Sequence, residues 1–212
     1  KSVLGSSYTQ KGRSGFRGKG SCLLHRKGEK QMQPLELYIH IPFCVKKCAY
    51  CDFLSGPAGE KEKEEYVKML VDEIRNCPDT VQNYRVISIF FGGGTPSLLT
   101  GEQIGRLMDT VREIFTLDED AEITMEMNPG TVTEEKLRKY RQAGVNRLSI
   151  GLQSVNDEEL RLLGRIHTYE EFREAYHLAR ANGFSNINVD LISAIPGQTV
   201  ESWEKTLKQV IA

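Results

Sequence analysis

YIHIPFCVKKCAYC, residues 38–51, joins a short apolar strand to a loop that carries three cysteines. Ile39 and Ile41 alternate with His40, as expected for a strand with two different faces. The cysteines follow at positions 44, 48 and 51, in the spacing CxxxCxxC. Three thiols clustered after a strand indicate ligation of a soft metal or an iron–sulfur cluster in a reducing compartment, rather than a disulfide framework.

The number of nearby ligands bears on the kind of metal site. A structural zinc site normally has four protein ligands, and here the fourth is missing locally. Cys22, Cys77 and His40 are the remaining candidates, although Cys22 lies in a Gly-rich segment, Cys77 ends a helix, and His40 fits packing within the strand. A [4Fe–4S] cluster on three thiolates would instead leave one iron open to a small molecule. The residues alone leave both interpretations open.

Strands and helices alternate from Leu35 onward. The strand candidates are short and rich in Ile, Val and Phe, and several are nearly continuous in apolar residues, as in strands buried on both faces of a parallel sheet. The expected strands are 37–41, 86–91, 122–127, 147–150 and 187–192. The expected helices are 60–76, 102–115, 133–142, 168–183 and 199–211.

This alternation predicts an α/β fold, either a TIM-like (β/α) barrel or a doubly wound sheet. No strand candidate follows the last helix. An open fifth strand would expose a row of unpaired backbone groups. We therefore expect a core domain over 34–212 that is a partial TIM-like barrel of parallel strands, truncated after about five βα units.

The first 33 residues differ in composition from the rest of the chain. They contain eight Lys or Arg and one Glu, a net charge of +7, which leaves 20 basic and 28 acidic residues, a net charge of −8, in 34–212. Six glycines and no apolar periodicity predict a disordered segment. A basic arm for an anionic partner, an organellar transit segment, or sequence upstream of a natural start at Met32 would each fit it, and we favour the last.

Composition also excludes some functions. The acidic body gives no electrostatic reason to expect a nucleic-acid partner. No apolar run approaches the roughly 18–20 residues that a membrane-spanning helix needs. We expect a cytoplasmic protein.

Polar or small residues lie in or directly after the carboxyl-terminal part of each of the later strands. They are the run GGGTPS at 92–97, then Glu126, Gln153 and Asp190. Each alone has an ordinary explanation as a tight turn, a cap or a satisfied core group. Because the carboxyl ends of barrel strands form the active site, their recurrence after successive strands indicates one shared site.

The combined motifs resemble one family. They are YIHIPFC at 38–44, FGGGTPS at 91–97, EMNP at 126–129, RLSIGLQS at 147–154, LGRIH at 163–167 and NVDL at 188–191. Together they are similar, from about residue 35 to 212, to the radical S-adenosylmethionine (SAM) superfamily. Within it they resemble the group of oxygen-independent coproporphyrinogen III oxidases and HemW heme chaperones. The resemblance implies a [4Fe–4S] cluster whose open iron binds SAM, and one-electron cleavage of SAM to methionine and a 5′-deoxyadenosyl radical.

The resemblance also implies roles for particular residues. Cys44, Cys48 and Cys51 would hold the cluster. Tyr38 would lie near the methionine group of SAM, and Tyr50 would contact SAM. The other implied SAM contacts are Gly93, Gly94 and Thr95 at the amino-acid end, Glu126 and Gln153 at the ribose or methionine portions, Arg165 at a carboxylate, and Asp190 at the adenosine.

Position 53 separates the two subgroups. The oxidases carry a fourth cysteine two residues after the third, and this chain has Phe53 there. This departure resembles the HemW type, and implies a protein that binds heme as well as SAM and passes heme to an acceptor protein. The heme-binding motif of that type lies beyond position 212, and an electron donor is a further implied partner. The alternatives are a coproporphyrinogen oxidase or another radical SAM enzyme acting on a porphyrin or heme, so whether the protein is an enzyme stays open.

Overall fold

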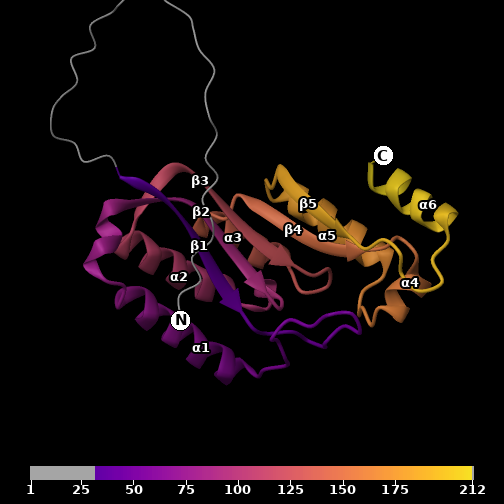
Figure 1. The fold of residues 1–212 in the computed structure, drawn as a ribbon, viewed down its shortest axis with the longest axis horizontal. Coiled ribbons are helices and arrows are strands. Elements are labelled where there is room, and N and C mark those ends of the chain that lie inside the picture. The colour runs from indigo at the N-terminus through magenta and orange to yellow at the C-terminus, as the bar shows by residue number, and fades with distance from the viewer. Residues whose placement is uncertain (1–31, 212) are drawn as a thin grey trace, which may run out of the picture. The chain divides into compact units, whose positions relative to one another are not determined.

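The computed structural model describes residues 32–211 of the chain (Figure 1). The predicted disordered segment therefore lies outside the described residues as far as position 31, and so does Cys22. Residue 33, the last of the predicted disordered segment, was assigned wrongly, because Gln33 begins the first strand and pairs with Tyr84. The strand begins before its apolar part because backbone pairing does not require apolar side chains.

Five parallel strands form one sheet in sequence order. Each strand pairs with the next along the chain, so the order is β1-β2-β3-β4-β5 and, among the described residues, β1 and β5 are its edges. The sheet is part of a barrel and is not closed, which confirms the predicted fold class. The strands are β1 Gln33–Ile41, β2 Tyr84–Gly93, β3 Thr116–Met127, β4 Arg147–Gln153 and β5 Asn186–Leu191.

Helices connect successive strands. The α-helices are α1 Glu60–Arg75, α2 Gly101–Ile114, α3 Glu134–Ala143, α4 Asp157–Leu162, α5 Tyr169–Ala181 and α6 Val200–Ile211, with short 3-10 turns η1 Asp79–Asn83 and η2 Pro96–Leu98. Thr100 and Gln103 form the predicted capping box of α2. Gly144 ends α3 in a left-handed conformation, as its sequence indicated.

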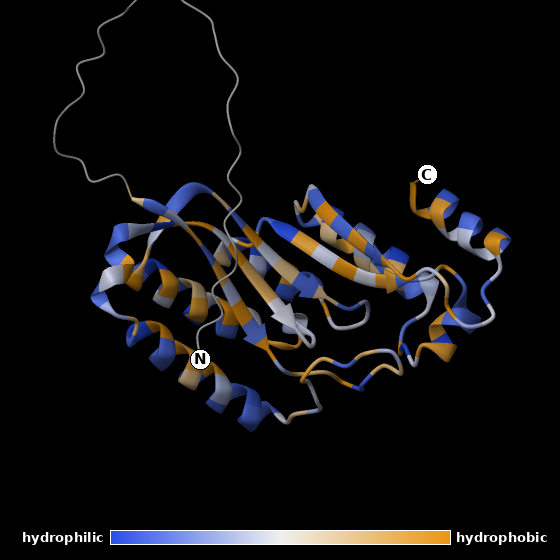
Figure 2. Cartoon of the chain, in the orientation of Figure 1, coloured by the Kyte–Doolittle hydropathy of each residue, from blue (hydrophilic) through white to orange (hydrophobic). Residues whose placement is uncertain are grey.

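The core lies between the sheet and the helices. Ile39 and Ile41 of β1, Phe91 of β2 and Leu107 of α2 are buried there. Tyr140 of α3 is fully buried, and its hydroxyl donates to the backbone oxygen of Leu99 at 2.6 Å. Figure 2 shows hydrophilic and hydrophobic residues alternating along the helices. In the described part of the chain, no helix combines the length and the apolar character needed to cross a bilayer.

The other face of the sheet carries the polar strand residues. In β1, Tyr38 and His40 alternate with the buried isoleucines, so they point away from the helices. Register places His40 beside Gly92 of β2, and places Gly151 of β4 beside Asp190 of β5. Parallel strands end at the same edge, so the loops that follow them meet there.

Candidate cofactor site

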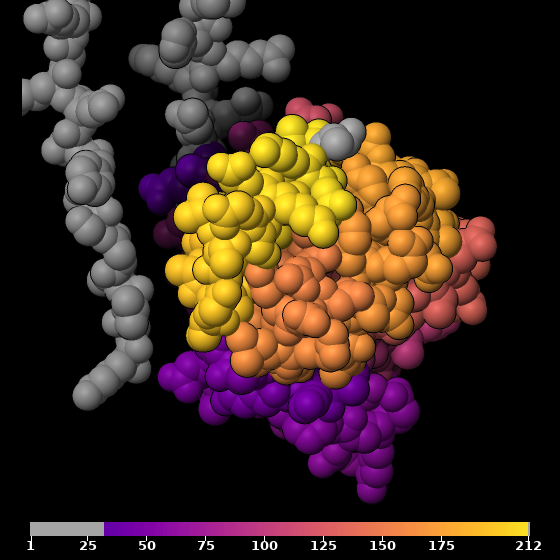
Figure 3. All heavy atoms as spheres, turned by 90° about the vertical axis from the view of Figure 1, so that its right-hand side faces the viewer, coloured from indigo at the N-terminus to yellow at the C-terminus, as the bar shows by residue number. Residues whose placement is uncertain are grey.

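The cysteine loop crosses the carboxyl edge of the sheet and is tied down at two places. Near its start, Cys44 N–H donates to Gly56 O at 2.9 Å and Gly56 N–H donates to Pro42 O at 3.0 Å. Further along, Ala49 N–H donates to Leu163 O, just after α4, at 2.9 Å. In Figure 3 the purple part of the chain lies against the orange part. The loop is thus closed on itself near β1 and bonded to the segment that follows α4.

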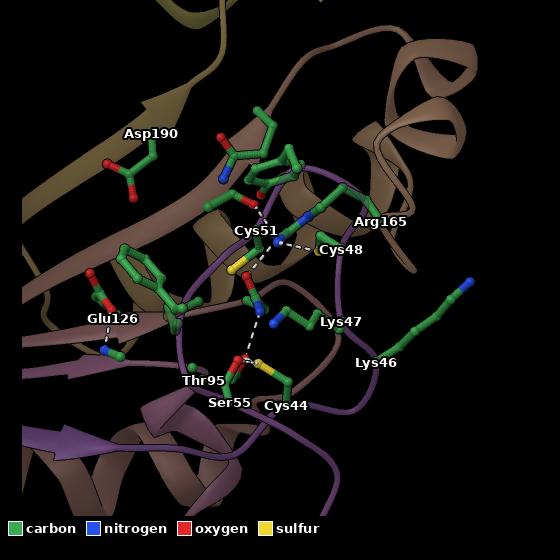
Figure 4. Close-up of a pocket in the computed structure, with 18 of the residues that line it drawn as sticks. Cys44, Lys46, Lys47, Cys48, Cys51, Ser55, Thr95, Glu126, Arg165 and Asp190 are labelled. Carbon is green, nitrogen blue, oxygen red and sulfur yellow. Dashed lines mark hydrogen bonds between the residues drawn. The ribbon is translucent and has the colours of Figure 1, made fainter.

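A pocket of about 170 Å³ lies beneath this loop (Figure 4). It brings together the three cysteines and residues that lie in, or just after, the carboxyl-terminal parts of β2, β3, β4 and β5. Its lining comprises Cys44, Lys46, Lys47, Cys48, Tyr50, Cys51, Phe53, Ser55, Gly93, Gly94, Thr95, Glu126, Met127, Asn128, Ser149, Gly151, Gln153, Arg165 and Asp190.

Glycines at the end of β2 allow the cysteine loop to approach the sheet. Gly93 has φ +118°, and a Cβ there would lie 2.6 Å from the His40 ring. A Cβ on Gly94 would lie 2.5 Å from Phe43 O and 3.0 Å from Cys44 Sγ. Side chains are therefore excluded at both positions, and the backbone itself forms the wall of the pocket.

Cys44 lies between two hydroxyl groups. Its Sγ is 3.5 Å from Ser55 Oγ and 3.6 Å from Thr95 Oγ1. Asn128, after β3, donates from Nδ2 to the same Thr95 Oγ1 at 2.8 Å. If Cys44 is a thiolate, both hydroxyls can donate to it and lower the cost of its charge.

The guanidinium of Arg165 connects Cys48 with the ends of β3 and β4. Nη1 is 3.7 Å from Cys48 Sγ, and Nη2 donates to Asn128 Oδ1 at 2.5 Å and to Gly151 O at 2.7 Å. Tyr50 lines the pocket beside them. Burial raises the pKa of Tyr50 above its ordinary value, whereas the neighbouring Arg165 acts in the opposite direction.

Two carboxylates lie on the opposite side of the pocket from Arg165 and Cys48. Glu126 Oε2 accepts a hydrogen bond from Gly93 N–H at 3.0 Å. Burial raises the pKa of Glu126, against the lowering effect of that hydrogen bond, and the charge of Asp190 raises it further. Asp190 accepts from Ser149 Oγ at 3.1 Å and from Asn188 Nδ2 at 2.7 Å.

Eight of the nine residues predicted to contact SAM line this one pocket. Tyr38 is the exception. It is largely exposed on β1, where its hydroxyl bonds His40 Nδ1 at 3.1 Å and its ring stacks on Phe90. Phe53 also lines the pocket, with its side chain 63% exposed. The position that separates the two subgroups therefore faces the same cavity as the cysteines.

The other proposed zinc ligands lie elsewhere. His40 is engaged by Tyr38 and, through Nε2, approaches Leu54 O at 3.4 Å. Cys77 Sγ donates to Glu73 O at the end of α1. Within residues 32–211, no group of three or more His, Cys, Asp or Glu side chains converges to hold a metal ion.

Asn128 is one site residue that the sequence did not single out. Its side chain bonds both Thr95, which lies beside Cys44, and Arg165, which lies beside Cys48. Its place directly after β3, before Pro129, was the available signal, because residues at carboxyl strand ends face the site. Ser55 and Lys47, on the cysteine loop itself, were also missed as pocket residues.

Comparison with known proteins gives the same family over most of the chain. Residues 38–210 match the Radical SAM superfamily. The heme chaperone HemW of Escherichia coli (strain K12) is 47% identical over 182 residues, which cover 85% of this chain and 48% of that protein. The oxygen-independent coproporphyrinogen III oxidase of Salmonella typhimurium is 40% identical and covers 84% of this chain and 39% of that protein.

A solved structure is similar as well. The coproporphyrinogen III oxidase (HemN) from Escherichia coli, described as a radical SAM enzyme, superimposes with a TM-score of 0.78 at 39% identity. The match covers 85% of this chain and 42% of that one. The chain spans about half the length, or less, of the relatives it matches.

Proposed function

Because this chain belongs to the radical SAM superfamily, we propose that Cys44, Cys48 and Cys51 hold a [4Fe–4S] cluster and that the adjoining pocket binds SAM. The supporting observation is that all three cysteines are free and line one cavity with Gly93 and Gly94. The bound cofactors would supply one-electron reductive chemistry. The protein supplies the ligands, the shape of the pocket and its charges.

The pocket offers different groups to the two ends of SAM. Gly93, Gly94 and Thr95 present backbone and hydroxyl groups beside Cys44, which suits the amino and carboxylate end of the methionine. Glu126, Gln153 and Asp190 offer hydrogen-bond acceptors or donors to hydroxyl groups of the ribose and to the adenosine. Tyr50 and Arg165 lie by Cys48. Tyr38 does not line the pocket, and its hydroxyl bonds His40, so a contact with SAM would require its side chain to turn.

We further propose that the protein acts as a HemW-like heme chaperone that binds heme and transfers it to an acceptor protein. Phe53 is the observation that favours this function over the oxidase. It lines the pocket where the resemblance places a fourth cysteine in the oxidases. Phenylalanine has no thiol and therefore neither ligates a metal nor transfers a proton or hydrogen atom as a thiol does.

This proposal is tested on the natural gene product that contains this chain, at its full length. The protein is incubated without oxygen with SAM, a strong reductant and coproporphyrinogen III, and the porphyrins are then separated. We expect no protoporphyrinogen, together with heme binding in a parallel titration. Multiple turnovers to protoporphyrinogen would establish the oxidase instead. Absence of both product and heme binding would leave only the radical SAM assignment.

A further inference from the structure

The turn after α4 is built against the middle cysteine of the loop. Leu163 O accepts the Ala49 N–H, and Gly164 adopts φ +77°. A Cβ on Gly164 would lie 3.3 Å from Ala49 N and 3.7 Å from the Cα of Cys48. The next residue, Arg165, is therefore held beside Cys48 by the backbone and not only by its own side chain.

The guanidinium of Arg165 is fixed in direction. Both hydrogens of Nη2 are used, by Asn128 Oδ1 and Gly151 O, which orients Nη1 toward Cys48 Sγ at 3.7 Å. Nε is buried and has no hydrogen-bond partner among the described residues. Within residues 32–211, no ion pair joins Arg165 to a carboxylate, so its positive charge is not neutralised by an acidic side chain.

A fixed cation that donates to a ligand sulfur changes the redox chemistry of a cluster. Reduction adds one electron to the cluster, and the added negative charge is shared with the ligand sulfurs. A hydrogen bond from a guanidinium stabilises that charge, so it favours the reduced state. We propose that Arg165 is a tuning residue, which orients the Cys48 thiolate and raises the reduction potential of the cluster. This inference rests on the proposed cluster site.

The test is a redox titration of the reconstituted chain, without SAM, in which a low-potential reductant supplies the electron and EPR follows the reduced cluster. Arg165→Met removes the charge and the donors while keeping the length of the side chain, and should move the midpoint potential to more negative values. Arg165→Lys keeps the charge without the planar fork and should give a smaller shift in the same direction. Arg161→Met is the matched control, because Arg161 is exposed on α4 and its side chain donates to the backbone oxygen of Asp157, away from the cysteines. Its potential should equal that of the unaltered chain.

Equal midpoint potentials in Arg165→Met and the unaltered chain, at equal iron and sulfide content, would overturn the inference. If Arg165→Met fails to assemble a cluster, Arg165→Lys and Arg165→Gln provide the comparison. The expected order of potentials is then Arg above Lys above Gln, and any other order contradicts the proposal. Failure of the unaltered chain to assemble a cluster would instead contradict the proposed function, so the two failures are distinguishable.

Discussion

At the scale of single residues, His167 stands out because it is buried without being part of the pocket. Its side chain is 4% exposed, and Nε2 lies 3.3 Å from Leu152 O. A carbonyl oxygen only accepts, so Nε2 carries the hydrogen, and Nδ1 is left without a partner among the described residues. Leu152 directly precedes Gln153, which has φ +75° and lines the pocket. We infer that His167 supports this strained residue from behind.

His167 makes the stability of the fold depend on pH. Burial, assisted by the charge of Arg165, lowers the pKa of His167 to about 4, whereas Glu171 and Asp157 oppose the shift. The unfolded chain binds a proton near the ordinary value of about 6.5. Above pH 6.5 His167 is neutral in both states and costs no stability. As pH falls from 6.5 toward 4 the unfolded chain takes up a proton that the folded state does not, and the free energy of unfolding falls by roughly 3 kcal/mol.

Urea unfolding of the unaltered chain and of His167→Gln between pH 7 and pH 4 measures this effect. Gln keeps a donor for Leu152 O but does not titrate. The free energy of unfolding should fall more steeply in the unaltered chain. Parallel curves would show that His167 is not the titrating group.

Residue identities at the site were predictable where a motif stood at the end of a strand. Cys44, the glycines and Glu126 are such cases, and the structure brings them to one pocket. Tyr38 illustrates the limit. The resemblance predicted it near the methionine group of SAM, but it lies outside the pocket lining, and the sequence could not show that its hydroxyl bonds His40. Contacts such as Asn128 with Arg165 join residues 37 positions apart, and no local pattern encodes them.

At the scale of elements, the turn after β2 determines how closely the cysteine loop packs. Gly94 N–H donates to Ile41 O at 2.8 Å, and Gly94 leaves no room for a side chain against Phe43 O and Cys44 Sγ. The obstacle at Phe43 is backbone, which cannot rotate away. The turn and the loop must therefore move apart if a methyl group is added.

Gly94→Ala should destabilise the protein by about 1–3 kcal/mol, the usual cost of overpacking, and should lower the iron bound on reconstitution. Gly105→Ala is the matched control. Gly105 lies within α2, and a Cβ there meets nothing within 4 Å, so the change should stabilise by about 0.5–1 kcal/mol. Denaturant unfolding and iron analysis of both variants give the comparison. Full iron content and unchanged stability in Gly94→Ala would contradict the packing described.

Element boundaries were predictable only where the pattern was strong. The helices were located to within one or two residues at most ends, because their apolar faces and caps agree. The six-residue helix α4 was missed, since it is too short to show periodicity. β3 starts at Thr116, six residues before the predicted start, because backbone pairing with Arg85 and Val86 of β2 extends the strand through its polar first half.

At the scale of the whole molecule, the βα rhythm predicted the parallel sheet and the shared carboxyl edge. Each connection returns the chain to the amino edge, so every strand runs toward the same carboxyl edge, and the pocket there collects residues from Cys44 to Asp190. The sequence left zinc open as an alternative. Two of the three candidate fourth ligands, His40 and Cys77, are bonded elsewhere in the structure, and the third, Cys22, lies outside the described residues.

Cluster ligation by three cysteines, with one iron left for SAM, is tested most directly by EPR of the reduced, anaerobically reconstituted chain, recorded with and without SAM. We expect about four irons and four sulfides per chain, and a signal that changes when SAM is added. Cys44→Ala, Cys48→Ala and Cys51→Ala should each lose that signal. Cys77→Ala should keep it, because the Cys77 thiol bonds Glu73 O in the unaltered chain. Stoichiometric zinc without labile sulfide, or a signal unaffected by SAM, would contradict the proposed site.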